Sequence, residues 1–221
     1  MTARPSTIHT IRWGPLLTRL ERFYSTGNWR VPVLRERGAD PFGVLVSTVL
    51  SHRTRDEVTK RAALRLLSAY PTVRSLSEAK LADIQERIRD VGLAESKARG
   101  LHQAAKCIVG EYGGSVPDTE DKLASLPLVG KKTASAVLVF GFKKPAIPAD
   151  VHIHRVVNRM GVVRTATLEE TSTALQQVVP KTQWHRLNPV LVQHGQNLCR
   201  AHKPACDACP ILPYCGRVGL P

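Results

Sequence analysis

Apolar residues recur at every third or fourth position along much of the chain. The first clear series is Val58, Ala62, Leu66 and Tyr70. Because an α-helix turns once every 3.6 residues, this spacing places the apolar side chains on one helix face. Further series of this kind predict helices near residues 81–91, 98–108, 151–160, 168–178 and 184–198. No segment alternates apolar and polar residues as a half-buried strand would, so the predicted fold class is all-α.

Two sequence signals predict where individual helices begin. Ser75 with Glu78, and Thr167 with Glu170, have the spacing of a capping box. In a capping box, two side chains reciprocally satisfy backbone N–H groups at the first turn of a helix. The Pro-containing stretch Lys143–Pro148 has the composition of a linker between two helical bodies.

Length and composition limit the class of protein. The chain has 221 residues, of which 43% are hydrophobic, so it can bury a core in one or two domains. The longest apolar stretches, Val44–Leu50 and Ala134–Phe142, are far shorter than the roughly 20 residues that span a membrane. Met1–Leu20 contains no continuous apolar run, so we expect no signal peptide. We therefore expect a cytoplasmic protein, nucleoid-associated if its source is prokaryotic, with reduced thiols.

The net charge points to a class of partner. Lys and Arg number 32 against 18 Asp and Glu, which gives a formal net charge of +14. The excess is shared equally between residues 1–119 and 120–221, so it belongs to the folded body rather than to a tail. Such a surface attracts polyanions, nucleic acid before anionic membrane. A basic surface that only confers solubility remains the alternative.

A short turn separates two helical segments in the middle of the chain. Residues 126–130 read Leu-Pro-Leu-Val-Gly and lie between segments 120–125 and 131–140, which together form a helix–hairpin–helix. The backbone N–H groups of such a turn and of the following helix start can bind one phosphate without reading sequence. Many helical hairpins contain a proline and a glycine, so the net charge is what favours DNA here.

Three residues near this turn are candidates for chemistry. Lys131 and Lys132 begin the second helix, where the helix N-terminus and a neighbouring cation both favour a neutral, nucleophilic amine. The two lysines alone favour the other interpretation, a solvated pair that binds phosphate. Asp150 precedes the helix at 151–160 and could cap it. The same carboxylate could also take a proton from the lysine or face a developing cation.

Four of the five cysteines lie close together near the end of the chain. Cys199, Cys206, Cys209 and Cys215 have the spacing C-x6-C-x2-C-x5-C, which does not suit a disulfide framework. Zinc sites more often use two separated C-x2-C pairs or mix Cys with His, whereas four thiolates in one loop suit a [4Fe–4S] cluster. Zinc remains the alternative, with free thiols a more remote one. The fifth cysteine, Cys107, is expected to be a buried, inert thiol.

Together, the segments LPLVGKKTA and PADVHIHRV and the cysteine spacing resemble the endonuclease III family of DNA glycosylases and AP lyases. The resemblance extends over Val31–Cys215 and implies two helical domains with a DNA cleft between them. One is a six-helix barrel with the helix–hairpin–helix at residues 34–144. The other is an iron–sulfur cluster domain formed by residues 1–33 and 145–221. The resemblance also implies a monomer that binds double-stranded DNA containing damaged bases or abasic sites.

The resemblance assigns roles by motif position. Lys132 and Asp150 fall on the catalytic lysine and aspartate, and the four loop cysteines fall on the ligands of a [4Fe–4S] cluster. Leu93 matches the residue that wedges into the duplex, and Gly130 and Lys131 belong to the hairpin that binds the DNA backbone. Lys132 implies a bifunctional glycosylase/AP lyase of base excision repair. Such an enzyme removes damaged bases, oxidised pyrimidines in this family, and cuts the strand by β-elimination through a Schiff base.

Three residues depart from the family pattern. Leu128 replaces a glycine of the hairpin, and a leucine is strained there if the position requires positive φ. Arg53 replaces a common Gln and could contact the orphaned base, stack, or bind a phosphate. Ala94 replaces a common Tyr after the wedge. We expect these departures to affect lesion and opposite-base preference more than the reaction class.

Two other functions remain alternatives at this point. One is a mismatch-specific DNA glycosylase on the same fold, and the other is a non-catalytic, metal-stabilised DNA-binding protein in which Lys132 only binds phosphate. The histidines do not distinguish between these two alternative functions. His152 and His154 face different sides of a helix and make a poor metal pair. His194 is expected to pack near the cysteines.

Overall fold

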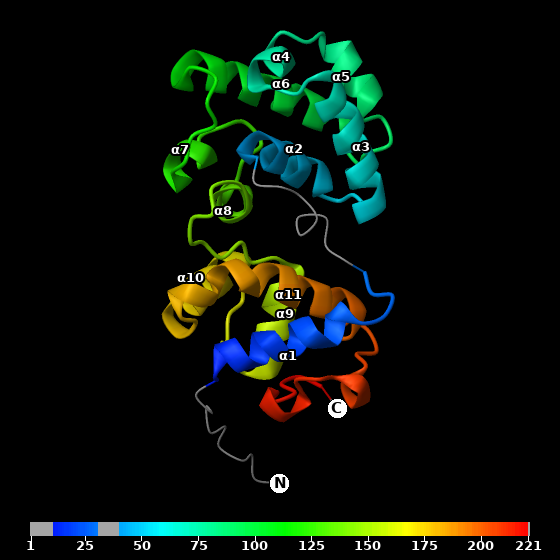
Figure 1. The fold of residues 1–221 in the computed structure, drawn as a ribbon, viewed down its shortest axis with the longest axis vertical. Coiled ribbons are helices and arrows are strands. Elements are labelled where there is room, and N and C mark those ends of the chain that lie inside the picture. The colour runs from blue at the N-terminus through cyan, green and yellow to red at the C-terminus, as the bar shows by residue number, and fades with distance from the viewer. Residues whose placement is uncertain (1–10, 31–39, 221) are drawn as a thin grey trace. The chain divides into compact units, whose positions relative to one another are not determined.

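The computed structural model describes residues 11–30 and 40–220, and every regular element within them is a helix (Figure 1). The all-α prediction is thus confirmed. The α-helices are α1 (Trp13–Ser25), α2 (Pro41–Ser51), α3 (Asp56–Ala69), α4 (Val73–Ser77), α5 (Leu81–Arg87), α6 (Ala94–Tyr112), α7 (Glu120–Ala124), α8 (Lys131–Ala136), α9 (Val151–Met160), α10 (Leu168–Val178) and α11 (Trp184–Asn197). The other helices are the π-helix η2 (Val137–Gly141) and the 3₁₀-helices η3 (Lys181–Gln183), η4 (Cys206–Ala208) and η5 (Leu212–Tyr214).

The chain divides into two compact units. One consists of Met1–Val31 together with Ala149–Pro221, and the other of Pro32–Pro148. The predicted linker, Lys143–Pro148, contains no helix and ends where the second unit ends. The predicted domain limit between residues 33 and 34 lies outside the described residues. No helix in the described ranges is both long enough and apolar enough to cross a membrane.

In the unit of Pro32–Pro148, α2 is the central helix. It packs against α3, α6, α8 and η2, and every residue from Phe42 to Leu50 is buried. A helix that is apolar on all sides has no apolar stripe, which is why the spacing of apolar residues did not predict it. Its start is well defined, because the Asp40 carboxylate accepts hydrogen bonds from Phe42 N and Gly43 N and Pro41 occupies the first turn.

In the other unit, α11 packs against α1 and α9. α1 has a regular apolar stripe of buried residues, namely Trp13, Leu16, Leu17, Leu20 and Tyr24. The stripe has the 3.6-residue period of an amphipathic helix, so this helix could have been predicted and was missed. The indole N–H of Trp13 donates to the carbonyl of Val178 at 2.9 Å, which fixes α1 against the end of α10.

The two predicted capping boxes had different outcomes. Thr167 and Glu170 form the expected box at the start of α10, with Thr167 Oγ1 accepting from Glu170 N. The prediction for Ser75 and Glu78 was wrong, because Ser75 is the third residue of α4 and pairs with Thr72 instead. The short helix α4 thus starts before the predicted box, and its residues Val73 and Leu76 are both buried on one helix face.

The helix predicted at 131–140 changes its winding part of the way along. α8 ends at Ala136, and the chain continues as the π-helix η2 to Gly141. At Gly141 an added Cβ would lie 2.8 Å from the Cα of Pro41, so only glycine allows η2 to approach the start of α2 this closely. α8 and η2 thus position the helix–hairpin–helix turn against the central helix.

Candidate functional site

The helix–hairpin–helix turn connects α7 to α8. Val129 N donates to Leu126 O at 3.0 Å and closes the turn, and α8 then begins after Gly130. No side chain caps the start of α8. The first backbone N–H groups of a helix have no partner within the helix, so they can bind an external anion such as a phosphate.

Lys131 and Lys132 are exposed at the start of α8, whereas Thr133 is buried. Thr133 Oγ1 lies 3.4 Å from His52 Nε2, so the imidazole packs against the first turn of α8. Burial lowers the pKa of His52 below its usual value, and the charges of Lys132 and Lys97 lower it further. These effects favour the neutral imidazole, and the contribution of Lys132 shows that the two side chains are near neighbours.

Asp150 is the N-cap of α9 and belongs to the other unit. Its Oδ1 accepts hydrogen bonds from His152 N at 3.0 Å and Ile153 N at 2.9 Å. Both bonds end on the same carboxylate oxygen. The cap thus fixes the side chain rigidly while its second oxygen can serve as an acceptor for another group.

Three candidate DNA-contact residues share an unusual backbone conformation. Arg53, Leu93 and Leu128 have φ values of 54°, 60° and 62°, the left-handed region that favours glycine. The family pattern has glycine at position 128, so Leu128 adopts the strained conformation that its sequence position predicted. Leu93 is 60% exposed directly before α6. Each of the three side chains thus projects from a sharply turned loop.

The four loop cysteines line a single cavity beneath α9 and the end of α11. Cys199 follows α11, Cys206 and Cys209 enclose η4, and Cys215 follows η5. The cavity is otherwise mostly apolar, with Met160 among its lining residues. The four cysteines thus converge on one mostly apolar cavity.

The thiols are close enough to influence one another. Burial first, and then the charges of the other three loop cysteines, raise the pKa of Cys209 to about 11. Burial also raises the pKa of Cys215. Arg159 Nη1 lies 3.6 Å from Cys199 Sγ, and its guanidinium also donates to the carbonyls of Arg200 and Ala201. The fold thus places the positive guanidinium of Arg159 beside Cys199, where it would stabilise a thiolate.

The four loop cysteines are a candidate ligand set for an iron–sulfur cluster. In the described ranges, no three His, Cys, Asp or Glu side chains are arranged to hold one ion. Zinc requires four ligands at about 2.0–2.3 Å, which places the ligands almost in contact with one another. A [4Fe–4S] cluster is larger and takes one thiolate on each iron, so its ligands lie farther apart. Four cysteines around one cavity are enough to provide one thiolate for each iron of such a cluster.

The remaining histidines and Cys107 have structural surroundings. His194 accepts or donates a hydrogen bond with the Tyr24 hydroxyl at 2.8 Å and lies 3.7 Å from Cys209 Sγ, as the sequence predicted. Burial lowers the pKa of His194 to about 4. His154 Nδ1 contacts Thr171 Oγ1 at 2.7 Å. Cys107 packs against the core only in part, which corrects the expectation of a fully buried thiol.

Sequence reasoning missed two residues of this region, His52 and Lys97. Lys97 is only 4% exposed, and its ammonium lies within the unit of Pro32–Pro148. One signal was present, because Lys97 lies four residues before Leu101 and so falls on the apolar face of α6. A lysine at such a position must place its charge against buried acceptors. His52 had no comparable signal, since its contacts come from residues 81 positions away.

Comparison with known proteins supports this arrangement. A family model described as HhH-GPD superfamily base excision DNA repair protein matches residues 46–181. Endonuclease III of Thermotoga maritima is 43% identical over 176 residues, which cover 80% of this chain and 83% of that protein. Endonuclease III of Bacillus subtilis is 34% identical over 178 residues, covering 80% of this chain and 81% of that protein.

A solved structure extends the likeness to three dimensions. The structure described as a trapped endonuclease III–DNA covalent intermediate, an estranged-adenine complex, matches with a TM-score of 0.80 and 28% sequence identity. The match covers 94% of this chain and 97% of that chain. The similarity thus includes both units.

Proposed function

The chain belongs to the HhH-GPD superfamily of base excision DNA repair proteins, as an endonuclease III-like DNA glycosylase and AP lyase, and we propose that Lys132 is its nucleophile. The observation that carries the proposal is the exposed position of Lys132 in the first turn of α8, directly after the hairpin turn and near the partly buried His52. An exposed amine at this position is accessible to the sugar of a nucleotide that has left the base stack.

The proposed glycosylase step begins with a base that has left the stack. Extrusion costs a few kcal/mol and is easiest for damaged bases, which gives part of the selectivity. The neutral amine of Lys132 attacks C1′ of the deoxyribose, and the bond from C1′ to the base breaks. The base leaves with that electron pair and takes up a proton. Asp150 accepts the proton of the attacking amine or stabilises the positive charge that develops at the sugar.

The proposed lyase step follows from the bond that Lys132 has formed. The sugar ring opens and leaves a Schiff base between Nζ and C1′. The positive nitrogen acidifies the C2′ proton, and its removal expels the 3′ phosphate as the bond from C3′ to oxygen breaks. Water then hydrolyses the Schiff base and releases the lysine. The products are a cut strand and a regenerated enzyme.

We assign DNA binding to the loops of the barrel domain, residues 34–144. The hairpin, with Leu128, Gly130 and Lys131, binds one backbone phosphate through its N–H groups. Leu93 fills the space beside the extruded nucleotide, and Arg53 contacts the orphaned base. The substrate is double-stranded DNA that contains an oxidised pyrimidine or an abasic site, bound by a monomer.

We assign the cluster domain to residues 1–33 and 145–221. Cys199, Cys206, Cys209 and Cys215 would hold a [4Fe–4S] cluster, which would crosslink the end of the chain and stabilise its basic loop. That loop, from Arg200 onward, would then present its positive charge to the DNA backbone. Zinc in place of iron would contradict this assignment.

Borohydride trapping tests the proposed nucleophile. Reduction in the presence of abasic-site duplex is expected to give a covalent protein–DNA adduct with the wild-type chain and none with Lys132→Ala. Lys122→Ala, which removes an exposed lysine of α7 before the hairpin, is the control and should retain the adduct. A wild-type chain that binds the duplex but forms no adduct would identify a mismatch-specific glycosylase or a non-catalytic DNA-binding protein.

A further inference from the structure

The ammonium of Lys97 makes three hydrogen bonds inside the unit of Pro32–Pro148. Nζ donates to Leu50 O at 2.8 Å and to Thr54 Oγ1 at 3.1 Å, and it also donates to His52 O. An ammonium has three protons to donate, so all of its donors are engaged. Lys97 belongs to α6, whereas its three acceptors belong to the end of α2 and the turn that follows.

The position of these acceptors explains why a cation is suitable there. The last carbonyls of a helix carry partial negative charge and lack partners within the helix. Lys97 binds them at the end of α2 and at the same time fixes the turn that contains Arg53 in its left-handed conformation. Burial in this place lowers the pKa of Lys97 to about 8.

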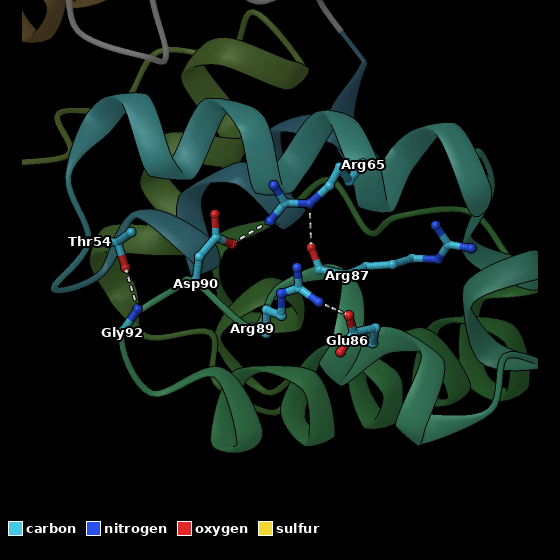
Figure 2. A network of polar contacts seen from close by, with 7 residues as sticks. All are labelled: Thr54, Arg65, Glu86, Arg87, Arg89, Asp90 and Gly92. Atoms are coloured by element: carbon cyan, nitrogen blue, oxygen red, sulfur yellow. Dashed lines mark hydrogen bonds and ion pairs between the residues drawn. The ribbon is translucent and has the colours of Figure 1, made fainter.

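Thr54 connects the same turn to a second loop. Its Oγ1, which accepts from Lys97, also accepts from Gly92 N at 3.2 Å (Figure 2). A Cβ at residue 92 would lie 2.6 Å from Arg53 O, so only glycine permits this approach. Because Leu93 is the next residue, the turn with Arg53 and the loop with Leu93 are held together through one hydroxyl.

The second loop is also held from its other end. Arg65 on α3 donates from Nε to Arg87 O at 2.9 Å, and its guanidinium pairs with the Asp90 carboxylate (Figure 2). The segment from Arg87 to Gly92 is therefore attached both to α3 and to Thr54. Leu93 leaves this segment in a fixed direction although its own side chain is exposed.

The helix that provides Lys97 also contacts the hairpin. Leu93, Lys97 and Gly100 are spaced four and three residues apart, which places them along one side of α6. At Gly100 an added Cβ would lie 2.0 Å from Leu128 Cδ1, so the hairpin leucine lies directly over this glycine. One side of α6 thus adjoins all three loops whose left-handed residues, Arg53, Leu93 and Leu128, we assign to DNA contact.

We propose that Lys97 is a positioning residue, which fixes the Arg53 turn relative to the Leu93 loop so that both can engage a damaged site in DNA. The inference rests on the proposed roles of those two loops. Lys97 touches neither substrate nor DNA and acts through Thr54 and the carbonyls of Leu50 and His52. A residue that only stabilised the fold would affect binding to all duplexes equally, whereas a positioning residue affects the lesion complex selectively.

Equilibrium binding to two duplexes of the same sequence tests the proposal. One contains a tetrahydrofuran abasic-site analogue, which cannot react, and the other is undamaged. Lys97→Met is expected to lower the preference for the analogue about tenfold, the effect of losing a hydrogen bond to a charged group. Binding to the undamaged duplex should stay within about twofold, because the hairpin and the surface charge that provide it are unchanged.

Two further variants keep the test decisive. Thr54→Val removes the shared hydroxyl at nearly constant volume and should lower the same preference about threefold, a partial loss of the hydrogen-bond energy. Added to Lys97→Met it should have little further effect, since both act through one contact. If Lys97→Met does not fold, Thr54→Val alone decides. Lys106→Met removes an exposed lysine of the same helix and should leave the preference between the two duplexes unchanged.

Three results would overturn the proposal. The first is an unchanged preference for the analogue in folded Lys97→Met or, if that variant does not fold, in Thr54→Val. The second is an equal loss of binding to both duplexes. The third is a wild-type chain that shows no preference for the analogue. Borohydride trapping on wild type separates these results from a failure of the proposed nucleophile. An adduct with wild type together with an unchanged preference in Lys97→Met would remove only the positioning role.

Discussion

Leu128 and Gly100 form a pair in which each residue depends on the other. Leu128 has φ of 62°, a conformation that costs an L-residue roughly 1–2 kcal/mol. Its side chain lies over Gly100 of α6, where any larger residue would overlap it. The hairpin therefore tolerates a leucine at a glycine position because α6 offers a glycine opposite.

This pairing predicts a non-additive effect on stability. Gly100→Ala should destabilise the fold by about 1–3 kcal/mol, because the new methyl group overlaps Leu128. Leu128→Gly in the same chain should recover most of that loss, since it removes both the overlap and the left-handed strain. Denaturant unfolding of the two single variants and the double variant measures the coupling.

Gly110→Ala on the same helix is the matched control. Nothing lies within 4 Å of a Cβ added at Gly110, so alanine should stabilise α6 by about 0.5–1 kcal/mol through helix propensity. Equal effects of Gly100→Ala and Gly110→Ala would show that Leu128 does not restrict position 100.

Asp150 has a structural role in addition to the chemical role that we propose. It caps α9 through two backbone N–H groups, and an asparagine can make the same bonds. The free energy of unfolding of Asp150→Asn should therefore lie within about 0.5 kcal/mol of the wild-type value. Its single-turnover base excision should fall at least about 100-fold, because an amide cannot take a proton.

Asp150→Ala separates the two roles from the other direction. It should lose the same activity and in addition about 1 kcal/mol of stability, because the cap is absent. Unfolding curves and single-turnover rates, measured on both variants, provide the comparison. Full activity in Asp150→Asn would leave Asp150 with the capping role alone.

Among the elements, the cysteine loop is the one whose order we expect to depend most on the proposed cluster. Its only regular elements among the described residues after α11 are two three-residue helices, η4 and η5. A loop with so little regular secondary structure gains order from a crosslink at its centre. The four thiols around one cavity are placed to provide that crosslink.

Metal analysis tests the nature of this crosslink. The purified protein should be brown and contain about four iron and four sulfide per chain. Cys206→Ser should lose iron and become more sensitive to proteolysis between residues 199 and 215. Cys107→Ser, on α6 in the other unit, is the control and should retain both metal and colour. A colourless protein with one zinc would contradict the cluster.

At the scale of the whole molecule, charge governs the first encounter with DNA. The formal net charge of +14 attracts the phosphate backbone of any duplex. Affinity for undamaged duplex should fall about 10- to 100-fold between about 50 and 200 mM salt, because bound phosphates release counterions. Titration across this range gives the slope, and an affinity independent of salt would contradict an electrostatic mode of binding.

Features set by neighbours in the chain were visible in the pattern of residues alone. The apolar spacing of α3, α6, α9 and α11, the Thr167 cap and the hairpin turn each depend on residues at most a few positions apart. The cysteine spacing belongs to this group as well, because four thiols within 17 residues of one loop lie near one another along the chain. Local geometry decides all of these features.

Features set by contacts between distant residues needed the folded chain. α2 is surrounded by other helices and has no polar face, so no periodicity could identify it. Lys97 meets acceptors more than 40 positions away, and Gly100 meets Leu128 across the hairpin. Spacing identified the candidates for the chemistry, but only packing determines which buried group contacts each loop, because burial joins segments that the chain order keeps apart.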